Sequence, residues 1–266
     1  MRVKMIAALA ALAVAGSANA ANLVVNGSFT SNNLTPLQLS ALAGAGRVGV
    51  EDDTHFAYPN AVTGWTSAPS ANNSDYNLYF FDGATAKTGD ADTRYPGEQQ
   101  RPNANFTGSS PDGGAFMVLD GDPGFSGDFQ QNITGLTFGQ SYVLSFWWAA
   151  GELSNRTGYS TEQLTGSIGG DAFATPVFTN SHPCFNNCQA GDFSGWRKLT
   201  VKFTASGPSE LLRFLSVGTA PQANLPPVAF LDGVSVAVPE PGVWALLLTG
   251  FASVGVMVRH RRRKLA

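Results

Sequence analysis

The chain has 266 residues, with 16 lysines and arginines against 19 aspartates and glutamates. Only 13% of the residues are charged, where soluble domains average about 25%, and this excludes a basic nucleic-acid-binding protein. The 30 glycines and 15 prolines interrupt any long helix, while aromatic residues reach 11%, so a collagen, a coiled coil and a disordered tail are also excluded.

The first 20 residues have the parts of a secretory signal peptide. A basic start leads into the apolar run Ile6–Ala15, and Ala18 and Ala20 form a small-residue cleavage site before Ala21. This run is too short to anchor the chain in a membrane, because a spanning helix needs about 20 apolar residues. The sequence therefore predicts export by the Sec machinery and cleavage before Ala21.

Residues 21–237 form the predicted domain. They carry nine positive and 18 negative charges, a net charge of −9. Such a surface repels nucleic acid and leaves carboxylates available for calcium. No proline-rich or serine-rich linker and no block of charge divides the segment, so we expect a single domain.

This domain is predicted to be built from strands. In Trp196–Ala205, Leu199, Val201 and Phe203 alternate with polar residues, which is typical of a half-buried strand. The other apolar runs are Leu23–Val25, Tyr76–Phe81, Ala115–Leu119, Ser141–Ala149, Ala172–Phe178, Leu211–Val217 and Val228–Val236. Eight or more antiparallel strands in about 217 residues predict an all-β fold, a jelly-roll-like β-sandwich.

Two stretches lack the strand pattern. Residues 33–60 are irregular, with a short helix expected at Leu37–Leu42, and residues 82–114 are polar and predicted to be one long loop. Gly44–Gly49 matches the dinucleotide fingerprint G-x-G-x-x-G. No strand precedes this motif, and Pro59 interrupts the segment that should form its helix and second strand, so we do not expect a nucleotide site.

The two cysteines are Cys184 and Cys188, which lie in a turn-rich segment. In an oxidising compartment we expect them to form a disulfide, which closes a short loop and stabilises the fold by about 2 kcal/mol. A zinc site that also uses His182 is the alternative, and three ligands without a second cluster indicate it only weakly.

Large aromatic residues are the candidate sugar platforms, because a flat ring stacks against the apolar face of a pyranose. The candidates are Trp65, Tyr79, Trp147, Trp148 and Trp196. Trp147 and Trp148 are adjacent on a predicted strand and point to opposite faces, so at least one of them belongs to the core. The sequence does not indicate which one faces outward.

Catalytic motifs are missing from the sequence. Neither G-x-S-x-G nor H-E-x-x-H occurs, and the domain contains only His55 and His182 as imidazole bases. A glycosidase that uses two carboxylates stays open, since that chemistry needs only two acids at a set separation. No pair among the 18 acids stands out, and we expect a protein that is not an enzyme.

Asp120 and Asp122 form an acidic turn after a predicted strand. With Asp128, their oxygens are candidate calcium ligands, although Gly124 stands where an EF-hand needs Asp or Asn and no Glu closes the loop. An ordinary polar turn is the alternative.

The C-terminal 29 residues have three parts. Val238, Pro239, Glu240 and Pro241 precede an uncharged stretch, residues 242–258, which would be about 25 Å long as a helix. A basic segment, residues 259–264, comes next and contains Arg259, Arg261, Arg262 and Arg263. Because these charges would be hard to place in a core, a helix across the inner membrane with a cytoplasmic basic end is favoured over a buried helix.

This tail resembles the sorting signal of PEP-CTERM exported proteins, in which a Pro-Glu-Pro box, one apolar helix and an arginine-rich end occur in this order. The resemblance covers residues 238–266. It implies processing by an exosortase-like membrane enzyme near the box, in a Gram-negative bacterium that makes extracellular polysaccharide.

The domain resembles galactose-binding-like sandwiches, which are common among carbohydrate-binding modules. The resemblance rests on residues 22–29, 116–122, 135–142 and 229–236. It implies that the first and last strands lie close together and that calcium bridges them. Asp232 matches the acidic position on the last strand, but Thr30 stands where the opening motif commonly has an acid.

Together these observations predict an exported protein of the cell envelope or extracellular matrix with weak binding to extracellular polysaccharide. The rivals are a purely structural or adhesive surface protein and a carboxylate-dependent glycosidase.

Overall fold

The computed structural model describes residues 21–36, 47–49, 60–68, 77–88, 101–154, 158–181, 192–219 and 227–239. Residues Asn22–Ala237 form one compact unit. Its described elements are the short helix α2 (Gly83–Thr88) and the strands β1 (Arg47–Gly49), β2 (Thr66–Ala68), β3 (Leu78–Phe80), β4 (Phe116–Asp120), β5 (Asp128–Thr134), β6 (Ser141–Glu152), β7 (Ser160–Ile168), β8 (Asp171–Ala174), β9 (Phe178–Asn180), β10 (Arg197–Thr204), β11 (Ser209–Thr219) and β12 (Pro227–Ala237).

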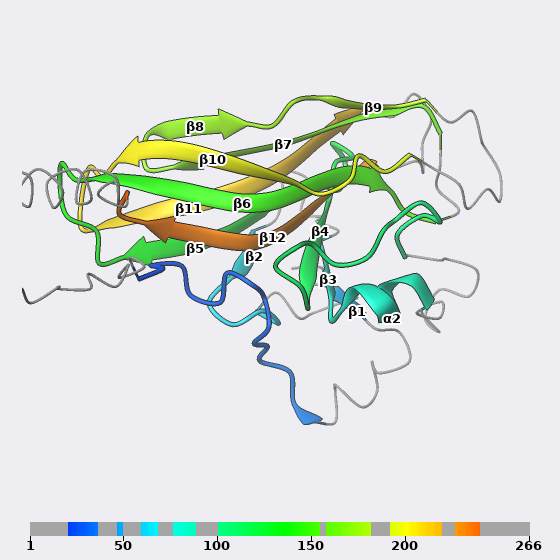
Figure 1. The fold of residues 1–266 in the computed structure, drawn as a ribbon, viewed down its shortest axis with the longest axis horizontal. Coiled ribbons are helices and arrows are strands. Elements are labelled where there is room, and N and C mark those ends of the chain that lie inside the picture. Colours follow the sequence, from blue (N-terminus) through cyan, green and yellow to red (C-terminus); the bar gives the residue numbers. More distant parts are fainter. Residues whose placement is uncertain are drawn as a thin grey trace, which may run out of the picture. The chain divides into compact units, whose positions relative to one another are not determined.

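The strands form two antiparallel sheets (Figure 1). The first sheet has the order β1-β3-β4-β12-β6-β10, and the second has the order β2-β5-β11-β7-β8, with β9 also paired to β7. From β4 to β7 each strand lies in the opposite sheet to the strand before it, and the same holds from β10 to β12, as in a jelly roll. The predicted all-β antiparallel sandwich is confirmed.

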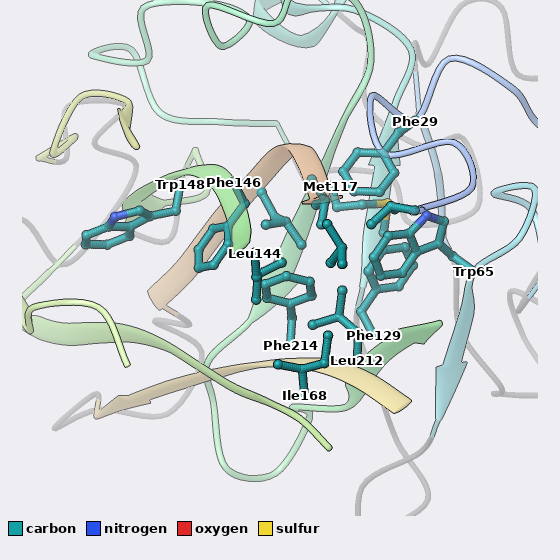
Figure 2. Close-up of a cluster of buried hydrophobic side chains, with 14 of the residues drawn as sticks. Phe29, Trp65, Met117, Phe129, Leu144, Phe146, Trp148, Ile168, Leu212 and Phe214 are labelled. Atoms are coloured by element: carbon teal, nitrogen blue, oxygen red, sulfur yellow. The ribbon is translucent and has the colours of Figure 1, made fainter. Parts of the chain in front are cut away.

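The main core lies between the sheets and follows the alternation of the long strands. On β6, Tyr142, Leu144, Phe146 and Trp148 point inward and are buried. Figure 2 shows Phe214 of β11 among these side chains, with Trp65 and Phe129 at one side of the cluster and Trp148 at the other. The rings of Trp65 and Phe129 stack with centroids 4.8 Å apart.

A second hydrophobic cluster covers part of the outward side of the first sheet. Its members are Leu78, Phe80, Ala86, Phe106, Phe116, Val118, Ala149, Leu153, Val228 and Phe230, with Phe193 and Trp196 packed against them. All five residues of β4 are therefore buried, because this strand faces the main core on one side and the second cluster on the other.

The N-terminal segment of the unit lies along β12. The amide N–H of Leu23 donates to the carbonyl of Val236 at 2.8 Å, and that of Val234 donates to the carbonyl of Gly27 at 3.0 Å. The predicted closeness of the two ends is confirmed. The predicted strand at Leu23–Val25 is wrong, because the chain turns there and Asn26 takes a positive φ of 54°.

Other sequence predictions need correction. Residues 82–114 are not one loop, since α2 occupies their start and Phe106 is buried in the second cluster. The predicted strand Ala172–Phe178 is divided into β8 and β9. Residues 47–49 form the strand β1 within the segment 33–60, which we predicted to be irregular.

Several predictions lie outside the described residues. They are the short helix at Leu37–Leu42, the cleavage residues Ala18 and Ala20, the pair Cys184 and Cys188, and the tail from Glu240 through Arg263. Within the described ranges, no helix combines the length and apolar character needed to cross a bilayer.

Candidate functional site

Three of the five aromatic candidates are enclosed in the core. Trp65, Tyr79 and Trp148 are 1%, 1% and 2% exposed. The prediction of a sugar platform at these three residues is therefore wrong, because no ligand can reach their rings. The polar atoms of two of them form hydrogen bonds inside the fold. Trp65 Nε1 donates to the carbonyl of Val25 at 3.1 Å, and Tyr79 Oη donates to the carbonyl of Phe29 at 2.7 Å.

Trp196 has a structural role in the second cluster. Its indole Nε1 donates to the carbonyl of Gly108 at 2.8 Å, and its ring makes edge contacts with Phe116 and Phe230. These contacts fasten the segment around Gly108 to the outward side of the first sheet.

Trp147 is the candidate that faces outward. It follows Phe146 and precedes Trp148, which both point into the main core, so its side chain leaves the opposite side of β6. It is half-buried and lies directly across from Lys198 of β10. The prediction that one tryptophan of the pair is core and the other faces outward is confirmed.

We call the surroundings of Trp147 the open face. It is the outward side of β10 and of the neighbouring parts of β6 and β12, and its residues are Val143, Ser145, Trp147, Lys198, Thr200, Lys202 and Ser235. None of these seven residues belongs to the second cluster, and the three residues of β10 are exposed. The long strands β6, β10 and β12 run side by side here (Figure 1).

Hydroxyl groups form a row across the open face. Ser145 pairs with Thr200 on one side and with Ser235 on the other. The row lies two residues from Trp147 along β6, a distance of about 7 Å. Next to it, Lys198 Nζ lies 5.9 Å from the centroid of the Trp147 ring.

A β-bulge borders the open face at Gly233. The register of β12 against β6 shifts between Asp232 and Ser235, and Gly233 has a φ of +57°. A Cβ atom on Gly233 would lie 2.9 Å from Trp147 Cδ1 and 3.1 Å from Asp112 Cβ. Glycine is required here because of the positive φ and because a side chain would collide with Trp147 and Asp112. Without a side chain at this position, Asp112 can lie beside Trp147.

Asp232 is the last residue before this bulge. It pairs across the strands with Trp147 and is fully buried. Burial raises the pKa of its carboxyl to about 8, with a further increase from the nearby charge of Asp112. Ser110 Oγ donates to Asp232 Oδ2 at 2.6 Å and the amide N–H of Gly233 donates to Oδ1 at 2.7 Å, and both bonds oppose that increase.

Sequence reasoning missed two other carboxyl groups with perturbed pKa values. Burial raises the pKa of Glu152 to about 7, opposed in part by the hydrogen bond from Ser160 Oγ at 2.9 Å. Burial also raises the pKa of Glu162 well above its ordinary value, although Ser216 Oγ donates to its Oε1 at 2.8 Å. Because their exposed fractions are 0% and 1%, neither carboxyl can touch a sugar at the surface.

The predicted calcium ligands do not converge. Asp120 Oδ1 accepts the amide N–H of Asp122 at 2.7 Å, and Asp122 Oδ1 accepts that of Gly124 at 2.8 Å. Asp120 pairs with Val228, four positions before Asp232 and so about 13 Å from it along β12. Across the described ranges, no three His, Cys, Asp or Glu side chains are grouped closely enough to hold a metal. Calcium binding at these aspartates stays a prediction.

No family model matches the chain, and no curated protein matches it. Among solved structures, it is similar to the module TmCBM61 in complex with β-1,4-galactotriose, with 11% identity and a TM-score of 0.37 over 82% of this chain and 99% of that one. A structure described as CBM4 has 14% identity and a TM-score of 0.31 over 80% of this chain and 98% of that one.

The enzymatically active domain of tailspike protein 4 from bacteriophage CBA120 is also similar, with 13% identity and a TM-score of 0.34 over 82% of this chain. This chain corresponds to only 21% of the tailspike's length. At these identities and scores, none of the three likenesses assigns a family or a ligand to the chain.

Proposed function

We propose that the chain is an exported surface or matrix protein whose β-sandwich binds carbohydrate on the open face. The observation that carries this proposal is the position of Trp147. Of the five aromatic candidates, it is the one that lies on an outward sheet face beyond the second cluster.

The chemistry of the open face suits a sugar. The indole of Trp147 offers a flat apolar surface, and the hydroxyl row of Thr200, Ser145 and Ser235 offers donors and acceptors about 7 Å away. An apolar anchor with a few fixed polar groups beside it is the usual composition of a small-molecule site. Lys198 does not block the ring, because an exposed cation–π contact contributes only about 0.5–1 kcal/mol and the flexible side chain can move aside.

Binding to a broad glycan panel tests this proposal. We expect at least one polysaccharide to be retained by the wild-type protein and lost with Trp147→Ala. Phe138→Ala is the matched control, since Phe138 is an aromatic residue that is 79% exposed in the turn between β5 and β6. If no glycan binds, carbohydrate binding is excluded. If both variants bind as the wild type does, the open face is excluded as the binding site. Self-assembly without sugar affinity would favour the structural or adhesive role.

We propose that exosortase-like processing delivers the domain outside the cell. The support is the sequence of the two ends: the cleavage site before Ala21 and the tail that begins at Val238. Cell fractionation with intact-mass analysis tests this. We expect mature termini near Ala21 and Pro239, and a Pro239→Ala, Glu240→Ala double variant should stay membrane-bound and unprocessed. A cytosolic protein that retains both ends would refute this route.

A further inference from the structure

The open face has a charge opposite to that of the domain as a whole. Residues 21–237 carry twice as many acids as bases. In contrast, the neighbouring segments 141–149, 197–204 and 233–237 contain Arg197, Lys198 and Lys202 and no acid. The acid just before the last segment, Asp232, pairs across the strands with Trp147 but is fully buried, so it is not part of the exposed surface. A third of the domain's nine positive charges is therefore on one eight-residue strand.

Two of these charges project from the open face itself. Lys198 and Lys202 are exposed, and they alternate with the inward-facing Leu199, Val201 and Phe203. Arg197 has the opposite strand parity and donates to the carbonyl of Ser194. Lys198 and Lys202 pair across the strands with Trp147 and Val143, so neither has an acidic cross-strand partner on β6.

The spacing of Lys198 and Lys202 favours a ligand with more than one acidic group. They are four residues apart on one strand, a distance of about 13 Å. When both side chains stand perpendicular to the sheet, as strand side chains usually do, a single carboxylate or sulfate is too small to pair with both ammonium groups. A chain with acidic groups at repeated positions can reach both while one of its sugars stacks on Trp147.

We propose that the ligand of the open face is an anionic polysaccharide, held by Trp147 through stacking and by Lys198 and Lys202 through charge. This inference rests on the proposed function, because it names the class of carbohydrate bound at the same face. Asp112, beside Trp147 at the bulge, marks the limit of the positive region.

The experiment compares polygalacturonate with a neutral galactan, using the full chain in detergent or its processed form. We expect polygalacturonate to bind more tightly and its affinity to fall as salt rises from about 0.01 M to about 1 M, because the Debye length shortens from about 30 Å to about 3 Å. Lys198→Gln with Lys202→Gln should lose about tenfold in affinity for polygalacturonate at low salt, the sum expected of two exposed charge pairs.

Single substitutions provide a matched control. Arg213→Gln also removes one positive charge, but from the outward side of the second sheet, where Arg213 pairs with Asp128 at 3.4 Å. Lys198→Gln should weaken polygalacturonate binding several-fold, and Arg213→Gln should not. Equal loss from both would mean that only net charge matters and would overturn the inference.

The remaining outcomes separate the two proposals. Equal binding of galactan and polygalacturonate, unchanged by the lysine variants but lost with Trp147→Ala, would overturn the anionic ligand and leave carbohydrate binding in place. If neither polymer binds, the anionic ligand is overturned, and the broad glycan panel decides carbohydrate binding separately. If Trp147→Ala changes nothing, both proposals fail at this face.

Discussion

Trp147 and Trp148 are consecutive residues whose side chains point to opposite sides of one sheet. Trp148 is enclosed in the main core, whereas Trp147 lies on the open face across from Lys198. The strand alternation of β6 causes this division, since successive side chains leave opposite faces. Within one dipeptide, Trp148 therefore contributes to the core, and Trp147 is the residue proposed to bind carbohydrate.

Alanine substitutions at these two positions should have different effects. Trp148→Ala should lower the free energy of unfolding by about 3–5 kcal/mol, because it leaves a large cavity in the core. Trp147→Ala should cost less than about 1 kcal/mol, mostly the lost contact with Lys198. Urea denaturation measures both values. Similar losses at the two positions would contradict the placement of Trp147 on the open face.

The stability of the domain should fall as the pH rises from acidic to mildly alkaline. A folded-state pKa above the unfolded value means that the folded state holds its proton longer, so the stabilisation is complete below the unfolded pKa and is lost as the pH rises through the folded pKa. For Asp232 this window runs from 3.8 to about 8, and for Glu152 from 4.5 to about 7. We expect a higher unfolding temperature at about pH 5 than at about pH 8.5.

Asp232→Asn should flatten this pH dependence, because an amide keeps the shape of the protonated carboxyl and does not ionise. Asp171→Asn is the control, since Asp171 is exposed at the start of β8. A profile that stays equally steep in Asp232→Asn, or that flattens equally in the control, would argue against Asp232 as a source of the effect.

The contact of Gly27 with β12 predicts a steric effect. A Cβ atom on Gly27 would meet the carbonyl oxygen of Val234, and the backbone oxygen cannot rotate away as a side chain could. Gly27→Ala should therefore destabilise the fold by about 1–3 kcal/mol, as overpacking does. Gly170→Ala, where no atom lies within 4 Å of the new methyl group, should change stability by less than about 0.5 kcal/mol in either direction. Equal urea midpoints for the two variants would refute the close packing of the N-terminal segment on β12.

The strands that sequence analysis predicted correctly have either an apolar alternation or a continuous apolar run, as in β4. In β10, Leu199, Val201 and Phe203 give a clear period of two, and the structure confirms it. β5 was missed because its inward side includes Gln131, whose amide group accepts from the N–H of Val25 and donates to the carbonyl of Gly64. A polar residue that is buried because its hydrogen bonds are all made inside the fold looks like a surface residue in the sequence.

The same limit applied to β7 and to the candidate site. In β7 the inward positions include Ser160 and Glu162, which gave no apolar signal.

The sequence placed Trp147 and Trp148 on opposite faces but could not orient them, because the alternation of a strand does not say which face meets the core. That choice depends on the other sheet, where Phe214 packs against Phe146 with centroids 5.0 Å apart.

Asp112→Asn should produce two effects that have one electrostatic cause. The charge of Asp112 raises the pKa of Asp232, so its removal should move the alkaline loss of stability to lower pH. It should also strengthen binding of polygalacturonate at low salt several-fold, because it removes a negative charge beside Trp147. Unfolding followed across a pH series measures the first effect, and binding at about 0.01 M and about 1 M salt measures the second. A shift in the pH profile without a gain in affinity would place the acidic ligand away from the bulge, and unchanged values of both would contradict the closeness of Asp112 to Asp232 and Trp147.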